Sequence, residues 1–179
     1  LLKNIKNKKY EIIFHLAAQV AVTSSIINPI LDFKSNLLST LNIISYIKNS
    51  KNKPLLIFSS TNKVYGNLKY LKLKENKKRY VSTPDSINEN FNLNFNTPYG
   101  CSKGSSDQYI TDFSKTYGFK SVVLRLSCIY GTFQNGIEDQ GWINWIIKKS
   151  LNKKTINFYG NGKQVRDILN INDLGNLFD

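Results

Sequence analysis

Apolar residues gather in three short runs that predict the strands of a buried sheet. The runs occupy 11–16, 54–58 and 121–126, and each is too short for a buried helix. The first run leads into Ala17 and Ala18, whose small side chains allow a backbone or a ligand to come close.

Two longer segments between these runs repeat apolar residues at helical spacing. They cover 29–47 and 98–117, and the second ends before Gly118, a residue type common just after a helix. Downstream, the pattern predicts a helix at 142–151, short strands at 156–158 and 167–171, and the start of a helix at 172–179. Because strands alternate with helix-length connections, we expect an α/β protein with a doubly wound parallel sheet and helices on both faces.

The segment 67–96 is polar and rich in Lys and Asn, so we expect an irregular surface excursion. It contains a basic cluster that is either a solvated surface or a clamp for phosphate. The cluster consists of Lys72, Lys74, Lys77, Lys78 and Arg79.

The composition indicates a folded domain. The 179 residues are 41% apolar, and no apolar run approaches the roughly 18 residues that a membrane span needs. The two cysteines cannot form a disulfide framework, and no signal-peptide pattern opens the chain. We therefore expect a cytoplasmic protein with no membrane partner, and no spacing in the sequence suggests a metal site.

The net charge of +13 does not by itself predict a nucleic-acid partner. Of the 25 basic residues, 22 are Lys, and Lys, Asn and Ile are all favoured by AT-rich coding. A biased genome can spread Lys over a surface without a selected partner, so we expect no nucleic acid.

Ligands of a doubly wound sheet bind at the carboxyl ends of its strands. Small and polar side chains stand at each of these ends, which makes that edge of the sheet the candidate site. The residues are His15, Ala17, Ala18, Gln19, Ser59, Ser60, Thr61, Ser127 and Cys128.

Tyr99 and Lys103 stand at i and i+4 near a predicted helix start, so the phenol and the ammonium share one helix face. A free phenol has a pKa of about 10 and cannot act as a base near neutrality. A nearby ammonium favours the phenolate, and lowering the pKa by about 3 units needs roughly 4 kcal/mol of differential interaction. The spacing therefore predicts a general base, with Lys103 lowering the pKa of Tyr99.

Three segments together resemble the extended short-chain dehydrogenase/reductase family of nucleotide-sugar epimerases and dehydratases. In chain order they read IFHLAAQ at 13–19, FSSTNKVYG at 58–66 and PYGCSK at 98–103. The later YGNGKQVRD at 159–167 is similar to that family's phosphate segment for the sugar nucleotide. The resemblance covers nearly the whole chain.

The resemblance implies an enzyme with NAD as cofactor and a nucleotide sugar as substrate. In that family Tyr99 would be the base, Lys103 would tune it and hold the nicotinamide ribose, and Thr61 would hydrogen-bond the reacting oxygen. Further residues are expected around the bound molecules. Those at the cofactor, together with Tyr99 and Lys103, are Ala17, Ala18, Gln19 and Ser59, and those at the substrate are Thr61, Ser127 and Arg166.

The family's glycine-rich phosphate turn, G-x-x-G-x-x-G, is absent, and the chain contains no Met. We therefore expect an internal piece of a longer protein that lacks the first βαβ units. The residue that selects NAD over NADP is expected to be lost with them, so that choice stays open. On this expectation residues 1–135 are the C-terminal part of the NAD-binding domain, and 136–179 begin a small substrate-binding domain. The piece by itself is expected to be inactive.

The residues after Thr61 bear on the reaction. The family's sugar dehydratases have an acidic pair there, whereas this chain has Asn62 and Lys63, which leaves epimerisation or simple oxidoreduction. The motif segments are most similar to members that epimerise C2 of a CDP-linked sugar. The alternative is a UDP-sugar 4-epimerase or another nucleotide-sugar oxidoreductase or dehydratase of the same family. A non-catalytic module that binds a nucleotide sugar or RNA is an alternative of another class. Relatives dimerise through the two long helices, so a homodimer or higher oligomer is expected.

Overall fold

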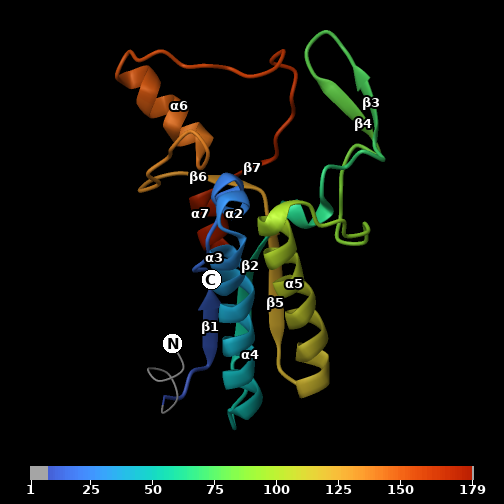
Figure 1. Cartoon of the computed structure of the whole chain (residues 1–179), viewed down its shortest axis with the longest axis vertical. Coiled ribbons are helices and arrows are strands. Elements are labelled where there is room, and N and C mark those ends of the chain that lie inside the picture. The colour runs from blue at the N-terminus through green and yellow to red at the C-terminus, as the bar shows by residue number, and fades with distance from the viewer. Residues whose placement is uncertain (1–7, 179) are drawn as a thin grey trace. The chain divides into compact units, whose positions relative to one another are not determined.

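The computed structural model describes residues 8–178, which divide into two compact units. The first unit contains the chain up to Gly66 together with Leu93–Leu126. The second unit contains Asn67–Asn92 and the chain from Ser127 onward. The elements of both units are labelled in Figure 1.

The first unit is built on a three-stranded parallel sheet in the order β1-β2-β5. These strands, β1 (Ile12–His15), β2 (Leu55–Thr61) and β5 (Ser121–Leu126), coincide with the three predicted apolar runs. Phe58 in the central strand lies opposite His15 of β1. Helical connections join the parallel strands, as in a Rossmann-like sheet, and this confirms the predicted fold class.

The connections between these strands are largely helical, although the segment from β2 to β5 also contains non-helical chain. They comprise α2 (Val22–Ile27), α3 (Pro29–Phe33), the π-helix η1 (Lys34–Leu38), α4 (Ser39–Asn49), the 3₁₀-helix η2 (Asn62–Tyr65) and α5 (Thr97–Tyr117). The predicted helix 29–47 is thus an α–π–α succession. Its start is fixed by Pro29 and by Asn28, whose side chain accepts a hydrogen bond from the N–H of Leu31 at 3.0 Å.

The core of this unit lies on one face of the sheet, where both α4 and α5 pack. Its buried residues are Ile43, Ile44, Ile47, Leu56, Phe58, Ile110 and Phe119. On the opposite face Ile12 and Val122 are 46% and 42% exposed. The connection from β1 to β2 and the connection from β2 to β5 cross the sheet in the same direction. When two such connections are both right-handed, their helices lie on the same face of the sheet. The helices expected on the second face are not among the described residues of this unit.

The second unit contains a β-hairpin, a short parallel strand pair and two helices (Figure 1). Its elements are β3 (Lys72–Glu75), β4 (Tyr80–Thr83), β6 (Cys128–Tyr130), α6 (Trp142–Leu151), β7 (Ile168–Asn170) and α7 (Ile171–Asn176). The helix predicted at 142–151 is confirmed. The end of the helix predicted at 172–179 lies outside the described residues, because they stop at 178.

Two secondary-structure predictions for this unit are wrong. The segment 67–96, expected to be irregular, contains the hairpin of β3 and β4. Asn76 closes its turn, since its Oδ1 accepts the backbone N–H groups of Lys78 and Arg79 at 2.9 and 2.8 Å. Residues 156–158, expected to be a strand, form none, and an isolated extended run has no partner to complete its backbone hydrogen bonds.

Candidate active site

Thr61 and Tyr99 meet at the carboxyl end of β2. Tyr99 lies in the first turn of α5, which Pro98 helps to start, and its backbone N–H donates to Ser25 Oγ at 3.1 Å. Thr61 ends β2 and caps η2, where its Oγ1 accepts the N–H of Lys63 at 3.3 Å. The side chains of Thr61 and Tyr99 are hydrogen-bonded and buried, so two of the predicted catalytic residues are in contact.

Lys103 lies one turn further along α5 and is only 3% exposed. Its ammonium donates to the carbonyl oxygen of Ser59 and lies 4.2 Å from the ring centroid of Phe58. Burial lowers the pKa of Lys103 from 10.5 to about 8, while the negative charges of Asp107 and Asp32 oppose this shift. The amine is thus held at the strand end, close to the position that Thr61 and Tyr99 occupy.

The phenol of Tyr99 is held in its protonated form near neutrality in this structure. Burial raises its pKa above the ordinary 10.0, the hydrogen bond with Thr61 lowers it in part, and the charge of Asp32 raises it. The expectation that Lys103 lowers the pKa of Tyr99 is therefore wrong for the chain by itself. The physical reason is that desolvation of the phenolate is the largest contribution, while the Lys103 ammonium is bonded to the Ser59 carbonyl.

His15 stands next to this group as a neutral imidazole. Its Nε2 lies 2.8 Å from Thr40 Oγ1, and the Thr40 hydroxyl lies 2.6 Å from the carbonyl oxygen of Asn36. Because a hydroxyl has one hydrogen and Thr40 gives it to that carbonyl, Nε2 is the donor to Thr40. Burial, and secondly the positive charge of Lys103, lower the pKa of His15 from 6.5 to about 4. His15 therefore has a structural role beside the site and does not transfer protons near neutrality.

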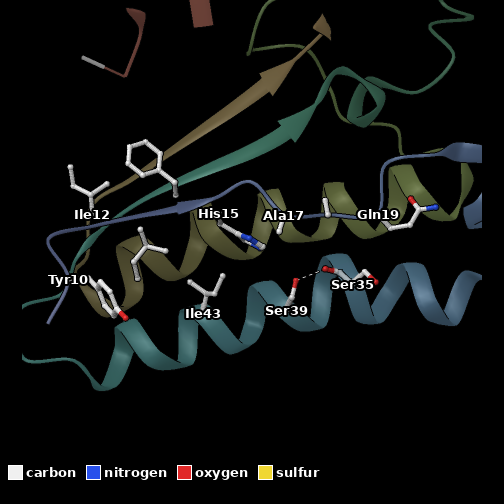
Figure 2. A pocket seen from close by; sticks show the side chains of 11 residues that line it. Tyr10, Ile12, His15, Ala17, Gln19, Ser35, Ser39 and Ile43 are labelled. Atoms are coloured by element: carbon white, nitrogen blue, oxygen red, sulfur yellow. Dashed lines mark hydrogen bonds between the residues drawn. The ribbon is translucent and has the colours of Figure 1, made fainter. Parts of the chain in front are cut away.

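A cavity of about 740 Å³ opens along β1 and the segment that follows it. Figure 2 shows His15, Ala17 and Gln19 in succession along this stretch, with Ser39 and Ile43 of α4 facing them. The complete lining is Tyr10, Ile12, Ile13, Phe14, His15, Ala17, Ala18, Gln19, Ser35, Ser39 and Ile43. The cavity thus brings together Ala17, Ala18 and Gln19 of the residues predicted to bind the cofactor. Ser59, Tyr99 and Lys103 are not part of its lining.

The residues of this cavity fit a nicotinamide dinucleotide. The side-chain Oε1 of Gln19 is buried and has no hydrogen-bond partner among the described residues, although buried acceptors normally have one. A ribose hydroxyl or a carboxamide supplies such a donor. The backbone of Gln19 is held in place, because its N–H donates to Asn36 Oδ1 at 2.9 Å and its carbonyl accepts from Asn36 Nδ2 at 3.1 Å.

The predicted substrate residues Ser127 and Arg166 lie in the second unit. Ser127 Oγ donates to the carbonyl oxygen of Asp167 at 2.6 Å, and the exposed Arg166 donates through Nη1 to the carbonyl oxygen of Val165 at 3.0 Å. Their role toward a substrate stays a prediction. Over residues 8–178 no group of three His, Cys, Asp or Glu side chains is arranged for a metal ion, and no helix could cross a membrane.

Sequence reasoning missed a buried polar network beneath the site. Asp32, Asn36 and Thr40 follow one another at intervals of four residues along α3, η1 and α4, and all three are buried. Ser102 of α5 contacts both Asp32 and Asn36. A polar stripe at helical spacing within an otherwise apolar helical segment is the signal that could have revealed it.

The chain matches the model of the NAD dependent epimerase/dehydratase family over residues 1–179. It belongs to this family. It is 43% identical over 172 residues to CDP-paratose 2-epimerase of Salmonella typhi, a match that covers 92% of this chain and 51% of the relative. It is 31% identical to a putative UDP-glucose 4-epimerase of Methanocaldococcus jannaschii, with 96% of this chain and 52% of the relative covered. The chain therefore spans about half the length of the curated relatives it matches.

Solved structures give the same family likeness. UDP-glucose 4-epimerase of Thermotoga maritima, solved with UDP-glucose, has a TM-score of 0.76 and 27% identity, and the match covers 96% of this chain and 52% of that one. The dTDP-glucose 4,6-dehydratase of Bacillus anthracis, solved in complex with NAD, has a TM-score of 0.74 and 26% identity, covering 99% and 49%. The prediction of an NAD-type cofactor is confirmed at the level of the family.

Proposed function

We propose that the protein containing these residues inverts C2 of CDP-paratose to give CDP-tyvelose, by way of a transient 2-keto sugar. The observation that carries this proposal is the buried set of Thr61, Tyr99 and Lys103, in a chain 43% identical to a CDP-paratose 2-epimerase. Asn62 and Lys63 support epimerisation over dehydration, because neither side chain readily serves as the acid and base that expel water.

The C2 hydrogen of such a sugar is not adjacent to a carbonyl, so it is not acidic enough for simple proton abstraction. NAD, when bound, supplies reversible acceptance of a hydride. The chain's own residues handle the hydroxyl: Tyr99 takes its proton, and Thr61 holds its oxygen by a hydrogen bond. Lys103 provides the positive charge that a tyrosinate requires, which means that its ammonium must act on the phenol when the site is loaded.

We propose that the cofactor is held along the cavity and at the adjoining strand end. The residues in these roles are Ala17, Ala18, Gln19, Ser59, Tyr99 and Lys103. Gln19 contributes its unpaired buried oxygen, and the two alanines allow close approach to the backbone. Ser127 and Arg166 are proposed to contact the nucleotide sugar, and the guanidinium of Arg166 suits a phosphate.

The test is an assay of the complete reading frame that contains these residues. The purified protein is incubated with NAD and either CDP-paratose or UDP-glucose, and inversion at C2 or C4 is read by proton NMR. The proposal expects C2 inversion of CDP-paratose, with the Salmonella typhi enzyme as the positive control. Inversion of UDP-glucose at C4 with CDP-paratose left unchanged would replace it by the second candidate. That candidate is supported by the 31% identity to the putative 4-epimerase of Methanocaldococcus jannaschii.

A non-catalytic binding module is the alternative of another class, and the net charge of +13 is the observation in its favour. Binding to heparin or RNA is measured in rising salt. Tight binding with a steep salt dependence, together with no turnover of either sugar nucleotide, would favour this alternative. Retention of the Thr61, Tyr99 and Lys103 set argues for the enzyme, because a binding module has no need of it.

We further propose a homodimer or higher oligomer that assembles through α3–α4 and α5, in a cytoplasmic enzyme of lipopolysaccharide biosynthesis. Ile30 and Leu31 of α3 are 63% and 54% exposed, which supports a covered face in the assembly. Light scattering of the complete protein tests this: a monomer at micromolar concentration contradicts it. The 179 residues alone, proposed as 1–135 of a cofactor domain and 136–179 of a substrate domain, are expected to show no turnover in the same assay.

A further inference from the structure

Asp32 is a carboxylate in the interior of the first unit, with 1% of its surface exposed. Its Oδ2 accepts a hydrogen bond from Ser102 Oγ at 2.5 Å, and its Oδ1 accepts one from Asn36 Nδ2 at 3.1 Å. Within residues 8–178 no Lys, Arg or His forms a salt bridge with it. A buried charge without an ionic partner is destabilising. A carboxylate at this position therefore indicates a role that offsets its cost to stability.

The hydrogen bonds of Asp32 fasten the turn of α5 that carries the catalytic pair. Ser102 directly precedes Lys103 and follows Tyr99 by three residues. Its Oγ also accepts from Asn36 Nδ2 at 3.0 Å, so Asp32, Asn36 and Ser102 form a closed triangle between α3, η1 and α5. The two catalytic side chains are therefore fixed to the same helical turn as a buried anchor.

Asn36 extends this anchor to the segment proposed to hold the cofactor. It lies in the π-helix η1, and π-helical turns are frequent at functional sites. Its side chain makes hydrogen bonds with both the N–H and the carbonyl of Gln19. One connected network thus joins the segment after β1 to the first turns of α5.

Burial lowers the pKa of Lys103, and the charges of Asp107 and then of Asp32 oppose this shift. Burial raises the pKa of Tyr99, and the charge of Asp32 adds to this shift. The titratable groups around this pair are His15 from β1, Asp32 from α3 and Asp107 from α5. Asp107 is already paired with Arg125 at 3.0 Å. Asp32 is therefore the nearby carboxylate that has no cation of its own.

Resting on the proposed function, we propose that Asp32 is a positioning residue for the reaction. Its carboxylate fixes the turn of α5 that carries Tyr99 and Lys103, and its charge favours Lys103 as an ammonium in a buried site.

An NMR titration of the Lys103 amine and the Tyr99 phenol in the complete protein, without substrate, tests the role of the charge. Asp32→Asn keeps the size and the hydrogen-bonding capacity of the side chain but removes the charge. Both midpoints should move to lower pH, because Asp32 raises both. Asp112→Asn, at an exposed position of α5, the helix that carries Tyr99 and Lys103, is the matched control and should move neither midpoint. Equal midpoints in the two variants would overturn the role of the charge.

Ser102→Ala tests the anchor separately, because it removes the link and retains the charge. In the complete protein we expect kcat to fall about tenfold at little change in KM, since small displacements of catalytic groups are costly. The pH–rate profile should keep its position in Ser102→Ala and move to lower pH in Asp32→Asn. A kcat equal to that of the unsubstituted protein would overturn the anchor. If Asp32→Asn does not fold, Ser102→Ala still decides whether Asp32 anchors the turn of α5.

The proposal for Asp32 and the proposed function are tested by different measurements, so one can fail while the other holds. A protein that turns over neither sugar nucleotide contradicts the proposed function, whereas the titration of Lys103 and Tyr99 needs no substrate and still judges Asp32.

Discussion

Arg125 and Asp107 form a two-point ion pair that joins β5 to α5. Arg125 Nε lies 3.0 Å from Asp107 Oδ2, and its second terminal nitrogen, Nη2, lies 3.1 Å from Oδ1. Ser60 Oγ donates to the same carboxylate at 2.7 Å, and Arg125 Nη1 donates to the Tyr65 hydroxyl at 3.0 Å. Because Asp107 lies one turn beyond Lys103, the pair fixes the catalytic helix against the sheet.

Loss of this ion pair should destabilise the fold. Asp107→Ala leaves the guanidinium of Arg125 without its partner, and we expect a loss of about 3–5 kcal/mol in the free energy of unfolding. Urea unfolding of the 179-residue chain, followed by circular dichroism, measures it. Asp112→Ala on the exposed side of α5 is the control and should change stability by less than about 0.5 kcal/mol. Equal midpoints for the two variants would contradict a structural role for the pair.

The core between α4, α5 and the sheet should be sensitive to a cavity. Ile47 is fully buried, at 0% exposed, so Ile47→Ala should lower the free energy of unfolding by about 2–5 kcal/mol. Ile27→Ala makes the same chemical change at a site that is 84% exposed and should have little effect on the monomer. The same urea experiment measures the free energy of unfolding of both variants. Similar losses for Ile47→Ala and Ile27→Ala would contradict the assignment of Ile47 to the core.

His15 should make the fold sensitive to acid. Its pKa is lowered to about 4 in the folded chain, from 6.5, so the unfolded chain binds the proton more readily between these values. The contribution to stability is complete above pH 6.5 and is lost as the pH falls through 4, by about 3 kcal/mol in total. Unfolding free energies of the unsubstituted chain and of His15→Gln are measured from pH 7 to pH 4. A parallel decline in both would mean that other groups carry the acid sensitivity.

Removal of the Tyr99 hydroxyl should abolish most of the activity while the fold persists. In the complete protein, Tyr99→Phe is expected to lower kcat about 10²–10⁴-fold, the range for a lost general base. Tyr109→Phe removes a hydroxyl from the same helix at a side chain that is 40% exposed, and its kcat should match that of the unsubstituted protein. C2 inversion of CDP-paratose is the readout, and full activity in Tyr99→Phe would exclude Tyr99 as the base.

The order of the elements could be read from the chain because helix and strand periodicity are local properties. The runs at 11–16, 54–58 and 121–126 became β1, β2 and β5, and the i, i+4 spacing placed Tyr99 and Lys103 on one turn. The π-helical turn within 29–47 was not predicted, since a single inserted residue barely disturbs an apolar periodicity. The hairpin of β3 and β4 was also missed, because its sequence is polar and its turn depends on the side chain of Asn76.

The sequence by itself determined the strands β1, β2 and β5, the long helical segments, the parallel sheet and the spacing of the catalytic pair, all of which follow from chemistry within a few residues. Only the tertiary structure decided that Asp32 meets Ser102 across 70 positions, and that the pKa of Tyr99 is raised rather than lowered. Burial and long-range electrostatics depend on which distant segments exclude water together, and no local pattern contains that information.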